Sequence, residues 1–264
     1  MEVSKHDPGM FCWVELGTSD QAGAKTFYSD LFGWTIDDKP MGPDEVYTIM
    51  QLNGKDAAAM YTLRPDLQQG VPPHWMTYIC VENADQAAEA ITAAGGTVMM
   101  GPFDVSTMGR MAVAQDPTGA HFSVWQPGDN NGVGVKNEAN AFCWAELATR
   151  DTAAAEAFYT RVFGWDPVHK EFGPIKYTEY YPHGRAAEGM AVGGMMDMPP
   201  ELGDVPAHWA VYFAVADCDD AAARAKALGA TVLAGPEDIP GVGRFAVMQD
   251  PQGAVFSTIK LDFA

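Results

Sequence analysis

The sequence is poor in basic residues and in long apolar runs. Lys and Arg number 16 against 35 Asp and Glu, which gives a formal net charge of −19 at pH 7. Such a chain repels a phosphate backbone, so we expect no nucleic-acid partner. No window has the length and apolarity of a membrane span, and the opening MEVSKHDPGM lacks a signal-peptide core. These absences predict a soluble, cytoplasmic protein with no membrane partner.

Cysteine is also scarce. Cys12, Cys80, Cys143 and Cys218 form no CxxC motif, and no histidine cluster stands beside them at the spacing of a zinc site. We therefore expect reduced, buried thiols, because free cysteine is among the residues most often found in protein cores.

What the sequence does contain is a repeat. FCWVELGTSDQAGAKTFYSDLFGW, which starts at Phe11, returns as FCWAELATRDTAAAEAFYTRVFGW from Phe142. GRMAVAQDPTGAHFSVW, from Gly109, returns as GRFAVMQDPQGAVFSTI from Gly243. Apolar residues make up 47% of the chain, enough for two packed cores. We predict one domain over residues 10–127 and a second over 140–264, joined by a polar, glycine-rich linker over 128–139.

Each copy predicts two βαβββ units. In the first unit a strand over 11–16 precedes a helix that Ser19-Asp20 caps and Gly33 ends, with strands over 34–36, 46–52 and 57–63 after it. In the second unit the strands fall at 75–81, 97–100, 110–115 and 120–125, around a helix that ends at Gly95. Asp116-Pro117-Thr118-Gly119 fits a type I turn, and Asp250-Pro251-Gln252-Gly253 is its twin. We therefore assign DPxG a structural role.

This layout, with FYxxxFGW after the first helix and DPxG before the last strand, resembles the vicinal oxygen chelate superfamily. That superfamily includes glyoxalase I, the bleomycin-resistance proteins and the extradiol dioxygenases, and the motifs look most like two-domain actinobacterial members labelled glyoxalase-like or hydroxylase-like. The resemblance implies an α+β fold, in which four βαβββ modules form two tandem domains, each a curved mixed sheet with a cleft. The resemblance is specific for the fold but says little about which reaction is catalysed, because one fold hosts many chemistries.

The resemblance also places a metal ligand on the first strand of each module and a carboxylate on the last strand. The corresponding positions hold Trp13, Met76 and Ser123 in the first copy and Trp144, Ala210 and Ser257 in the second. A catalytic divalent metal takes imidazole or carboxylate ligands, which these positions do not supply. We therefore expect no cofactor.

A displaced metal site is the alternative. Side chains two residues apart along a strand share a face, and Glu15, His74 and His121 each lie two residues from a standard position. They would form a 2-His-1-carboxylate set, the pattern of non-haem iron enzymes, in a metal-dependent lyase or oxygenase. Glu15 could instead pair with Arg110, as Glu146 could with Arg244. Glu15 and His74 are also candidates for general acid/base catalysis without a metal.

Aromatic side chains, Met and a few polar groups line both predicted clefts, and such a lining suits a flat or apolar small molecule. The predicted lining of the first cleft is Trp13, Glu15, His74, Met76, Tyr78, His121, Ser123 and Trp125, and that of the second is Trp144, Glu146, His208, Tyr212, Ser257 and Ile259. The leading hypothesis is a monomer or homodimer that binds an aromatic or polyketide-like metabolite in the first cleft. The remaining alternative is a structural or interaction protein in which tryptophan side chains fill the clefts.

Overall fold

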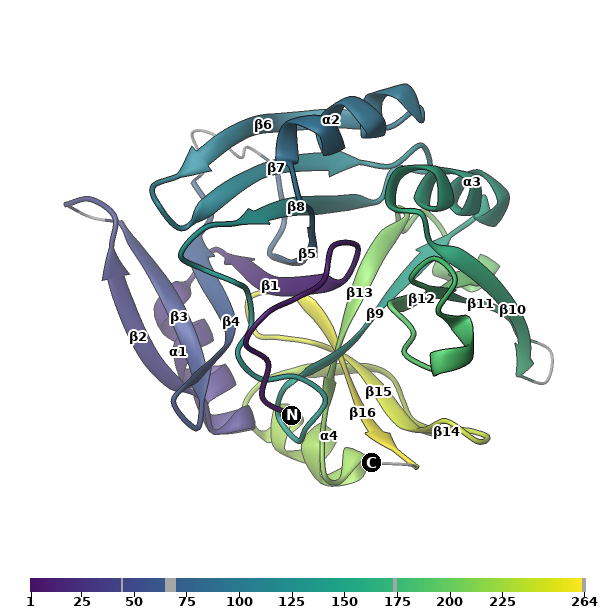
Figure 1. Cartoon of the computed structure of the whole chain (residues 1–264). Helices are drawn as coiled ribbons and strands as arrows, with labels where there is room; N and C mark the ends of the chain where they lie inside the picture. The colour runs from purple at the N-terminus through teal and green to yellow at the C-terminus, as the bar shows by residue number, and fades with distance from the viewer. Residues whose placement is uncertain (44, 65–69, 173–174, 263–264) are drawn as a thin grey trace.

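The computed structural model describes residues 1–43, 45–64, 70–172 and 175–262, which form two eight-stranded mixed sheets with helices (Figure 1). The first sheet has the strand order β2-β3-β4-β1-β5-β8-β7-β6, and the second has the order β10-β11-β12-β9-β13-β16-β15-β14. In Figure 1, β2–β4 stand upright while β6–β8 run across the top, so the first sheet curls. The α+β fold of four βαβββ modules is confirmed.

The elements of the two halves correspond one to one, apart from two short 3₁₀ turns in the second half. The first half holds β1 (Phe11–Thr18), α1 (Gln21–Phe32), β2 (Thr35–Pro40), β3 (Val46–Leu52), β4 (Lys55–Thr62), β5 (His74–Cys80), α2 (Ala84–Ala93), β6 (Thr97–Val105), β7 (Gly109–Gln115) and β8 (His121–Pro127). The second half holds β9 (Phe142–Thr149), α3 (Thr152–Phe163), β10 (Asp166–Phe172), β11 (Ile175–Tyr181), η1 (Ala186–Glu188), β12 (Gly193–Asp197), η2 (Pro200–Leu202), β13 (His208–Ala214), α4 (Cys218–Ala227), β14 (Thr231–Ile239), β15 (Gly243–Gln249) and β16 (Val255–Leu261).

Helix α1 begins and ends as its sequence predicts. The Asp20 carboxylate accepts a hydrogen bond from the Gly23 N–H, which satisfies one of the free amides of the first turn. Gly33 ends the helix in the left-handed conformation, with φ of 71°. Phe27 and Tyr28 lie on the buried face of the helix. Among the described residues, no helix is long and apolar enough to cross a membrane.

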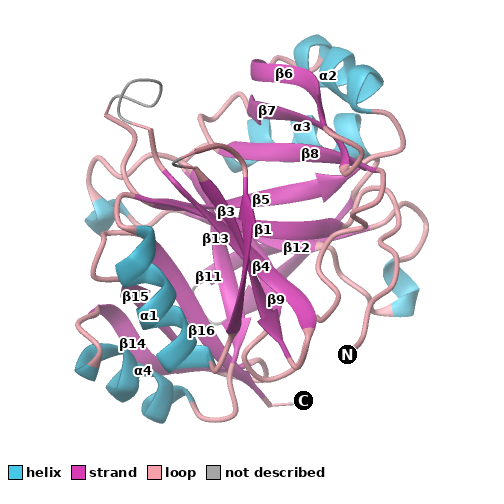
Figure 2. Ribbon diagram, turned by 90° about the vertical axis from the view of Figure 1, so that its left-hand side faces the viewer, coloured by secondary structure: helices cyan, strands magenta, loops and turns pink. Residues whose placement is uncertain are grey.

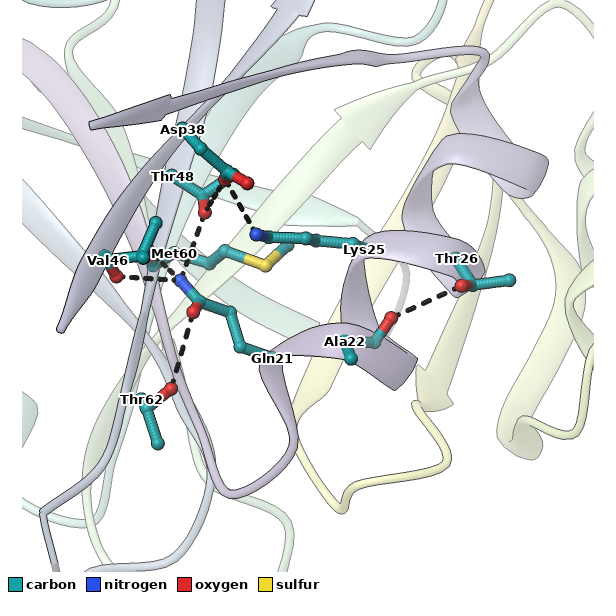
Figure 3. Close-up of polar contacts among 9 residues, drawn as sticks. All are labelled: Gln21, Ala22, Lys25, Thr26, Asp38, Val46, Thr48, Met60 and Thr62. Carbon is teal, nitrogen blue, oxygen red and sulfur yellow. Dashed lines mark hydrogen bonds and ion pairs between the residues drawn. The ribbon is translucent and has the colours of Figure 1, made fainter. Parts of the chain in front are cut away.

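Polar contacts hold the start of α1 against the strands that follow it (Figure 3). Gln21 Nε2 donates to the carbonyl oxygens of Val46 in β3 and Met60 in β4, at 3.1 Å each. Lys25 Nζ lies 2.6 Å from Asp38 Oδ1 in β2. These contacts fix the helix on its own module, so the aromatic side chains further along α1 can reach the other half of the protein.

One apolar core is shared by the two halves. Helix α1 lies beside α4, and α2 lies beside α3 (Figures 1 and 2). Each helix of the first half therefore packs against a helix of the second half. The ring of Phe11 in β1 is 4.9 Å from that of Trp209 in β13, and the ring of Tyr28 is 5.5 Å from that of Phe256 in β16. These buried aromatic contacts join the two sheets through their packed faces.

The repeated FY and DPxG motifs meet across the boundary between the halves. Tyr28 Oη donates to Asp250 Oδ2 at 2.9 Å, and Tyr159 Oη donates to Asp116 Oδ2 at the same distance. The other carboxylate oxygen of Asp116 accepts hydrogen bonds within its own turn, among them one from the Ala120 N–H. The turn predicted for DPxG is present, but each aspartate also binds a tyrosine of the opposite half. We call these two contacts the crossed Tyr–Asp bonds.

Residues 128–136, which follow β8, form a strap against the first half. The Val133 N–H donates to the Cys12 carbonyl of β1, and the Gly134 N–H donates to the Asp56 carbonyl of β4. Val133 is 1% exposed and packs with Trp13 in an apolar cluster on the face of the first sheet that is turned away from the shared core. The predicted linker therefore also fills one end of this face.

The last residue of the strap, Lys136, is a half-buried cation. Its Nζ donates to the Phe11 carbonyl at 3.2 Å and lies 4.9 Å from the centroid of the Phe142 ring. Burial lowers the pKa of Lys136 to about 8. The folded state thus disfavours the charged ammonium relative to the unfolded chain, in which lysine has a pKa near 10.4.

We expect Lys136→Met to stabilise the protein at pH 7 by about 1 to 3 kcal/mol and to lose that advantage at higher pH. Below pH 8 both states carry the proton, so wild type bears the full penalty of burying the charge. Between about pH 8 and 10.4 only the folded lysine is deprotonated, and the penalty disappears. Urea unfolding of both proteins across this range measures the difference, and a difference that does not change with pH would contradict this account.

Candidate functional site

In each half, we call the sheet face that is turned away from the shared core the open face. A buried carboxylate, Glu15, lies on the open face of the first half. Tyr78 Oη of β5 donates to Glu15 Oε1 at 2.9 Å, and Tyr47 Oη of β3 donates to Glu15 Oε2 at 2.5 Å. Trp13 Nε1 donates in turn to Tyr47 Oη at 3.2 Å. Three strands thus bring one carboxylate, two phenols and an indole into a single hydrogen-bonded cluster.

The second half repeats this cluster. Tyr177 Oη of β11 and Tyr212 Oη of β13 donate to the two carboxylate oxygens of Glu146, at 2.8 and 2.9 Å. Trp144 Nε1 donates to Tyr177 Oη at 2.9 Å. We call these two sets the Tyr–Glu–Tyr clusters, and the Trp-x-Glu of each first strand belongs to one of them.

Strand alternation explains where the clusters lie. In β9 the side chains of Phe142, Ala145 and Leu147 enter the shared core, whereas Trp144 and Glu146 point the other way. Gly194 of β12 lies directly beside Glu146, and a Cβ at Gly194 would overlap the Tyr177 hydroxyl. In this half the glycine leaves the space that the Tyr177 hydroxyl occupies, whereas Ala59 stands at the equivalent position of the first half.

Burial sets the protonation of the clusters. Desolvation raises the pKa of both Glu15 and Glu146, and the hydrogen bonds from the tyrosines partly oppose that shift. Desolvation raises the pKa of Tyr177 and Tyr212 well above 10, and the neighbouring carboxylate raises it further. The phenols therefore stay protonated and act as donors to the carboxylate.

The two open faces differ in accessibility. Trp13 is 4% and Glu15 is 9% exposed, and Trp13 belongs to the cluster that Val133 of the strap completes. Trp144 and Glu146 are only half-buried. The first face is largely filled at its cluster, whereas the indole and the carboxylate of the second cluster keep part of their surface exposed.

The predicted histidines lie at the ends of their strands. His74 Nδ1 is 2.9 Å from the Pro72 carbonyl, and His208 Nδ1 is 2.8 Å from that of Pro206. His121 is exposed, and burial of part of its ring together with the nearby His74 lowers its pKa. His74 and His208 therefore occupy equivalent places in the two halves.

The displaced metal site is not assembled. Both carboxylate oxygens of Glu15 accept tyrosine hydroxyls, and His74 turns one ring nitrogen to a backbone carbonyl. Within residues 1–43, 45–64, 70–172 and 175–262, no three His, Cys, Asp or Glu side chains come together to hold a metal ion. Glu15, His74 and His121 are therefore not brought together as a donor set in this structure, because neither histidine contacts the carboxylate, and a metal role for them stays a prediction.

The proposed arginine partners are also wrong. Arg110 binds Asp85 and Asp104 on the other side of its strand, at 2.8 and 2.9 Å. Arg244 makes the equivalent pairs with Asp219 and Asp238. Repetition in both halves correctly indicated a structural pair, but the partners are carboxylates of the neighbouring helix and edge strand, not Glu15 and Glu146.

The remaining predicted residues surround the clusters. Tyr78 and Tyr212 donate to the glutamates, and Ser257 hydrogen-bonds with Tyr212. The Ser123 hydroxyl is buried with no partner. Met76, Trp125 and Ile259 are buried or half-buried on the same strands. Sequence reasoning missed Tyr47 and Tyr177, although both precede a threonine at matching places in the repeat and could have been found there.

A family model described as "Glyoxalase/Bleomycin resistance protein/Dioxygenase superfamily" matches residues 11–124 and again 141–258. The chain belongs to this superfamily. Two solved structures show the same fold at low identity: a Mn(II)-bound glyoxalase from Novosphingobium aromaticivorans (TM-score 0.66, 16% identity, 96% of this chain and 82% of that one) and the 2,3-dioxygenase LapB from Pseudomonas sp. KL28 (TM-score 0.63, 12% identity, 96% and 93%).

Two curated relatives align with the chain over almost their whole length. The chain is 43% identical over 258 residues to the "Putative glyoxylase CFP32" of Mycobacterium tuberculosis, covering 97% of each chain. It is 35% identical over 273 residues to the "Anthracycline biosynthesis protein DnrV" of Streptomyces peucetius, covering 98% of this chain and 96% of that protein.

The expectation of no cofactor needs correction. The structural neighbours include a Mn(II)-bound glyoxalase and several dioxygenases, so a metal is part of the chemistry that this superfamily supports. The residues of this chain do not fit that group at the positions implied by the resemblance, because Trp13 and Trp144 donate indole N–H bonds to tyrosines and offer no ligand atom.

Proposed function

We propose that the protein binds a flat aromatic small molecule on the open face of the second half. The observation that carries this proposal is the accessible Tyr–Glu–Tyr cluster, in which a half-buried indole stands beside a half-buried carboxylate. A ligand site of this kind combines an apolar wall with a small number of fixed polar groups. Trp144 supplies the wall, and Glu146 supplies the polar contact.

The surroundings of the cluster add to the apolar wall. Phe172 of β10 lies 5.8 Å from the Tyr177 ring, and Phe245 of β15 is half-buried on the second sheet. Aromatic side chains bury a large area when a planar ligand stacks on them, and such contacts supply much of the binding free energy. The relative named for anthracycline biosynthesis favours the same ligand class, because an anthracycline is a polycyclic aromatic molecule.

In this proposal the first half has a structural role at its own cluster. Trp13 and Glu15 are buried, and the strap closes the end of that face next to Cys12. The hypothesis of a filled cleft thus applies to the first half, whereas the hypothesis of ligand binding applies to the second.

Tryptophan fluorescence tests the proposal with a planar absorbing probe, 2,6-dihydroxyanthraquinone. We expect saturable quenching of the wild-type protein, and Trp144→Phe should remove much of the quenching and weaken binding about fivefold, because stacking area and the bond to Tyr177 are lost. Trp13→Phe is the matched control and should leave the affinity unchanged. The titrations are run with and without Mn²⁺, because a solved member of the superfamily binds this ion.

Wild-type protein that showed no saturable quenching in either buffer would disprove the proposal. Equal loss of affinity in Trp13→Phe and Trp144→Phe would disprove the assignment to the second half. Circular dichroism of both variants separates a change in binding from a loss of fold.

A further inference from the structure

In the second Tyr–Glu–Tyr cluster, each hydroxyl and indole hydrogen is donated to another member of the cluster. The hydroxyls of Tyr177 and Tyr212 are both donated to Glu146, and the Trp144 N–H is donated to Tyr177. Tyr212 also hydrogen-bonds with Ser257. A phenol has one hydrogen to give, so neither tyrosine retains a donor for a ligand.

The hydrogen-bonding capacity that the cluster can offer a ligand consists of acceptor lone pairs. Each carboxylate oxygen of Glu146 accepts one tyrosine hydroxyl and can accept a second hydrogen bond. His208 adds a further acceptor on the same face. Its Nδ1 faces the Pro206 carbonyl, which can only accept, so the neutral ring carries its hydrogen on Nδ1 and leaves Nε2 as a lone pair.

Register places these two acceptors near each other. Ala210 of β13 lies opposite Glu146 of β9, and His208 lies opposite Ala148. His208 is therefore the diagonal cross-strand neighbour of Glu146 on one face, a separation that long and aromatic side chains can bridge. A ligand on this face meets two acceptors and no free phenol donor.

We propose that the ligand of the second half is a polyhydroxylated aromatic molecule that donates hydroxyl hydrogens to Glu146 and His208. This inference rests on the proposed function and adds the chemical class that the site selects. A methyl ether offers no hydrogen to the remaining lone pairs of Glu146, which would lose their contact with water, and a ligand carboxylate would place a second negative group beside it.

The electrostatics of the same face favour a neutral donor over an anion. Glu179 of β11 lies opposite Gly194, which lies beside Glu146, so two carboxylates share this part of the sheet. Lys170 Nζ lies 2.6 Å from a Glu179 carboxylate oxygen. The charge of Lys170 is therefore already paired with a carboxylate and does little to attract an anionic ligand. The net charge of −19 adds long-range repulsion of anionic molecules.

Isothermal titration with three probes of one ring system tests the inference: 2,6-dihydroxyanthraquinone, 2,6-dimethoxyanthraquinone and anthraquinone-2,6-disulfonate. The pH is kept below the ionisation of the probe's own phenols. We expect the dihydroxy probe to bind wild type at least about tenfold more tightly than the dimethoxy probe, and the disulfonate to bind most weakly. Glu146→Gln should reduce the preference for the dihydroxy probe, because an amide can donate as well as accept.

The matched control is Glu15→Gln, which changes the same group in the filled half and should leave the preference unchanged. Equal affinity for the dihydroxy and dimethoxy probes would overturn the donor inference while leaving the proposed function intact. Binding of none of the three probes would overturn both. A preference that survived in Glu146→Gln and in His208→Leu would also overturn the inference, because it would place the selecting acceptors elsewhere.

Discussion

Replacing Asp116 by alanine should lower the free energy of unfolding by about 3 to 5 kcal/mol. The side chain is 4% exposed, and its two oxygens accept the Tyr159 hydroxyl and the amides of Thr118 and Ala120. Alanine leaves these buried donors without a partner, and each carries a desolvation penalty. Urea unfolding followed by circular dichroism gives the difference.

Two further variants separate the turn from the contact between halves. Tyr159→Phe leaves the turn intact but removes the crossed Tyr–Asp bond together with the acceptor of the Trp209 indole N–H, and it should lower the unfolding free energy by about 1 to 3 kcal/mol. Asp104→Ala removes an exposed carboxylate that pairs with Arg110 and should change it by less than about 1 kcal/mol. If Asp116→Ala were as mild as Asp104→Ala, the crossed bonds would not contribute to the stability of the core.

Gly194→Ala should weaken binding of 2,6-dihydroxyanthraquinone about tenfold while the protein stays folded. The new methyl group would overlap the Tyr177 hydroxyl, so the phenol must move away from Glu146 and from the Trp144 N–H. The carboxylate then loses a donor that orients it, and the indole loses its anchor. Fluorescence quenching gives the affinity, and thermal unfolding gives the stability.

The repeat supplies the control for this change. Ala59 lies beside Glu15 as Gly194 lies beside Glu146, and Tyr47 still donates to Glu15, so a methyl group at this position is compatible with the fold. The clash expected in Gly194→Ala is specific to the second half, because the Tyr177 hydroxyl occupies the place of the new methyl group. Ala59→Gly should therefore leave ligand binding unchanged. Wild-type affinity in Gly194→Ala would show that Tyr177 does not shape the ligand site.

Local signals were sufficient to predict the modules. The cap at Asp20, the glycine at Gly33 and the apolar spacing between them fixed α1, and the same pattern recurs in the second half. The alternation of Trp13 and Glu15 in β1 predicted which side chains share a face. These features depend on neighbours within a few residues, so the sequence alone contains them.

The contacts between distant elements were not predictable in the same way. Tyr47 of β3 reaches Glu15 of β1 only because β4 pairs with both strands. The two side chains then lie on the same face of one sheet. The strap looks polar and rich in glycine, yet Val133 is buried because the backbone around it bonds to β1 and β4. Arg110 binds carboxylates of α2 and β6 because strand alternation points its side chain to the face opposite that of Glu15.

The crossed Tyr–Asp bonds also bear on how the two halves of the chain are related. Each half completes its tyrosine with an aspartate that only the other half supplies, and the two contacts are related as they would be in a symmetric pair of identical subunits. The two halves are therefore related as the subunits of a homodimer with a twofold axis would be, although they belong to one polypeptide. A covalent link lets two such halves differ in sequence without breaking the shared contacts. In this chain the cluster of the first half is buried beside the strap, whereas that of the second half is half-buried.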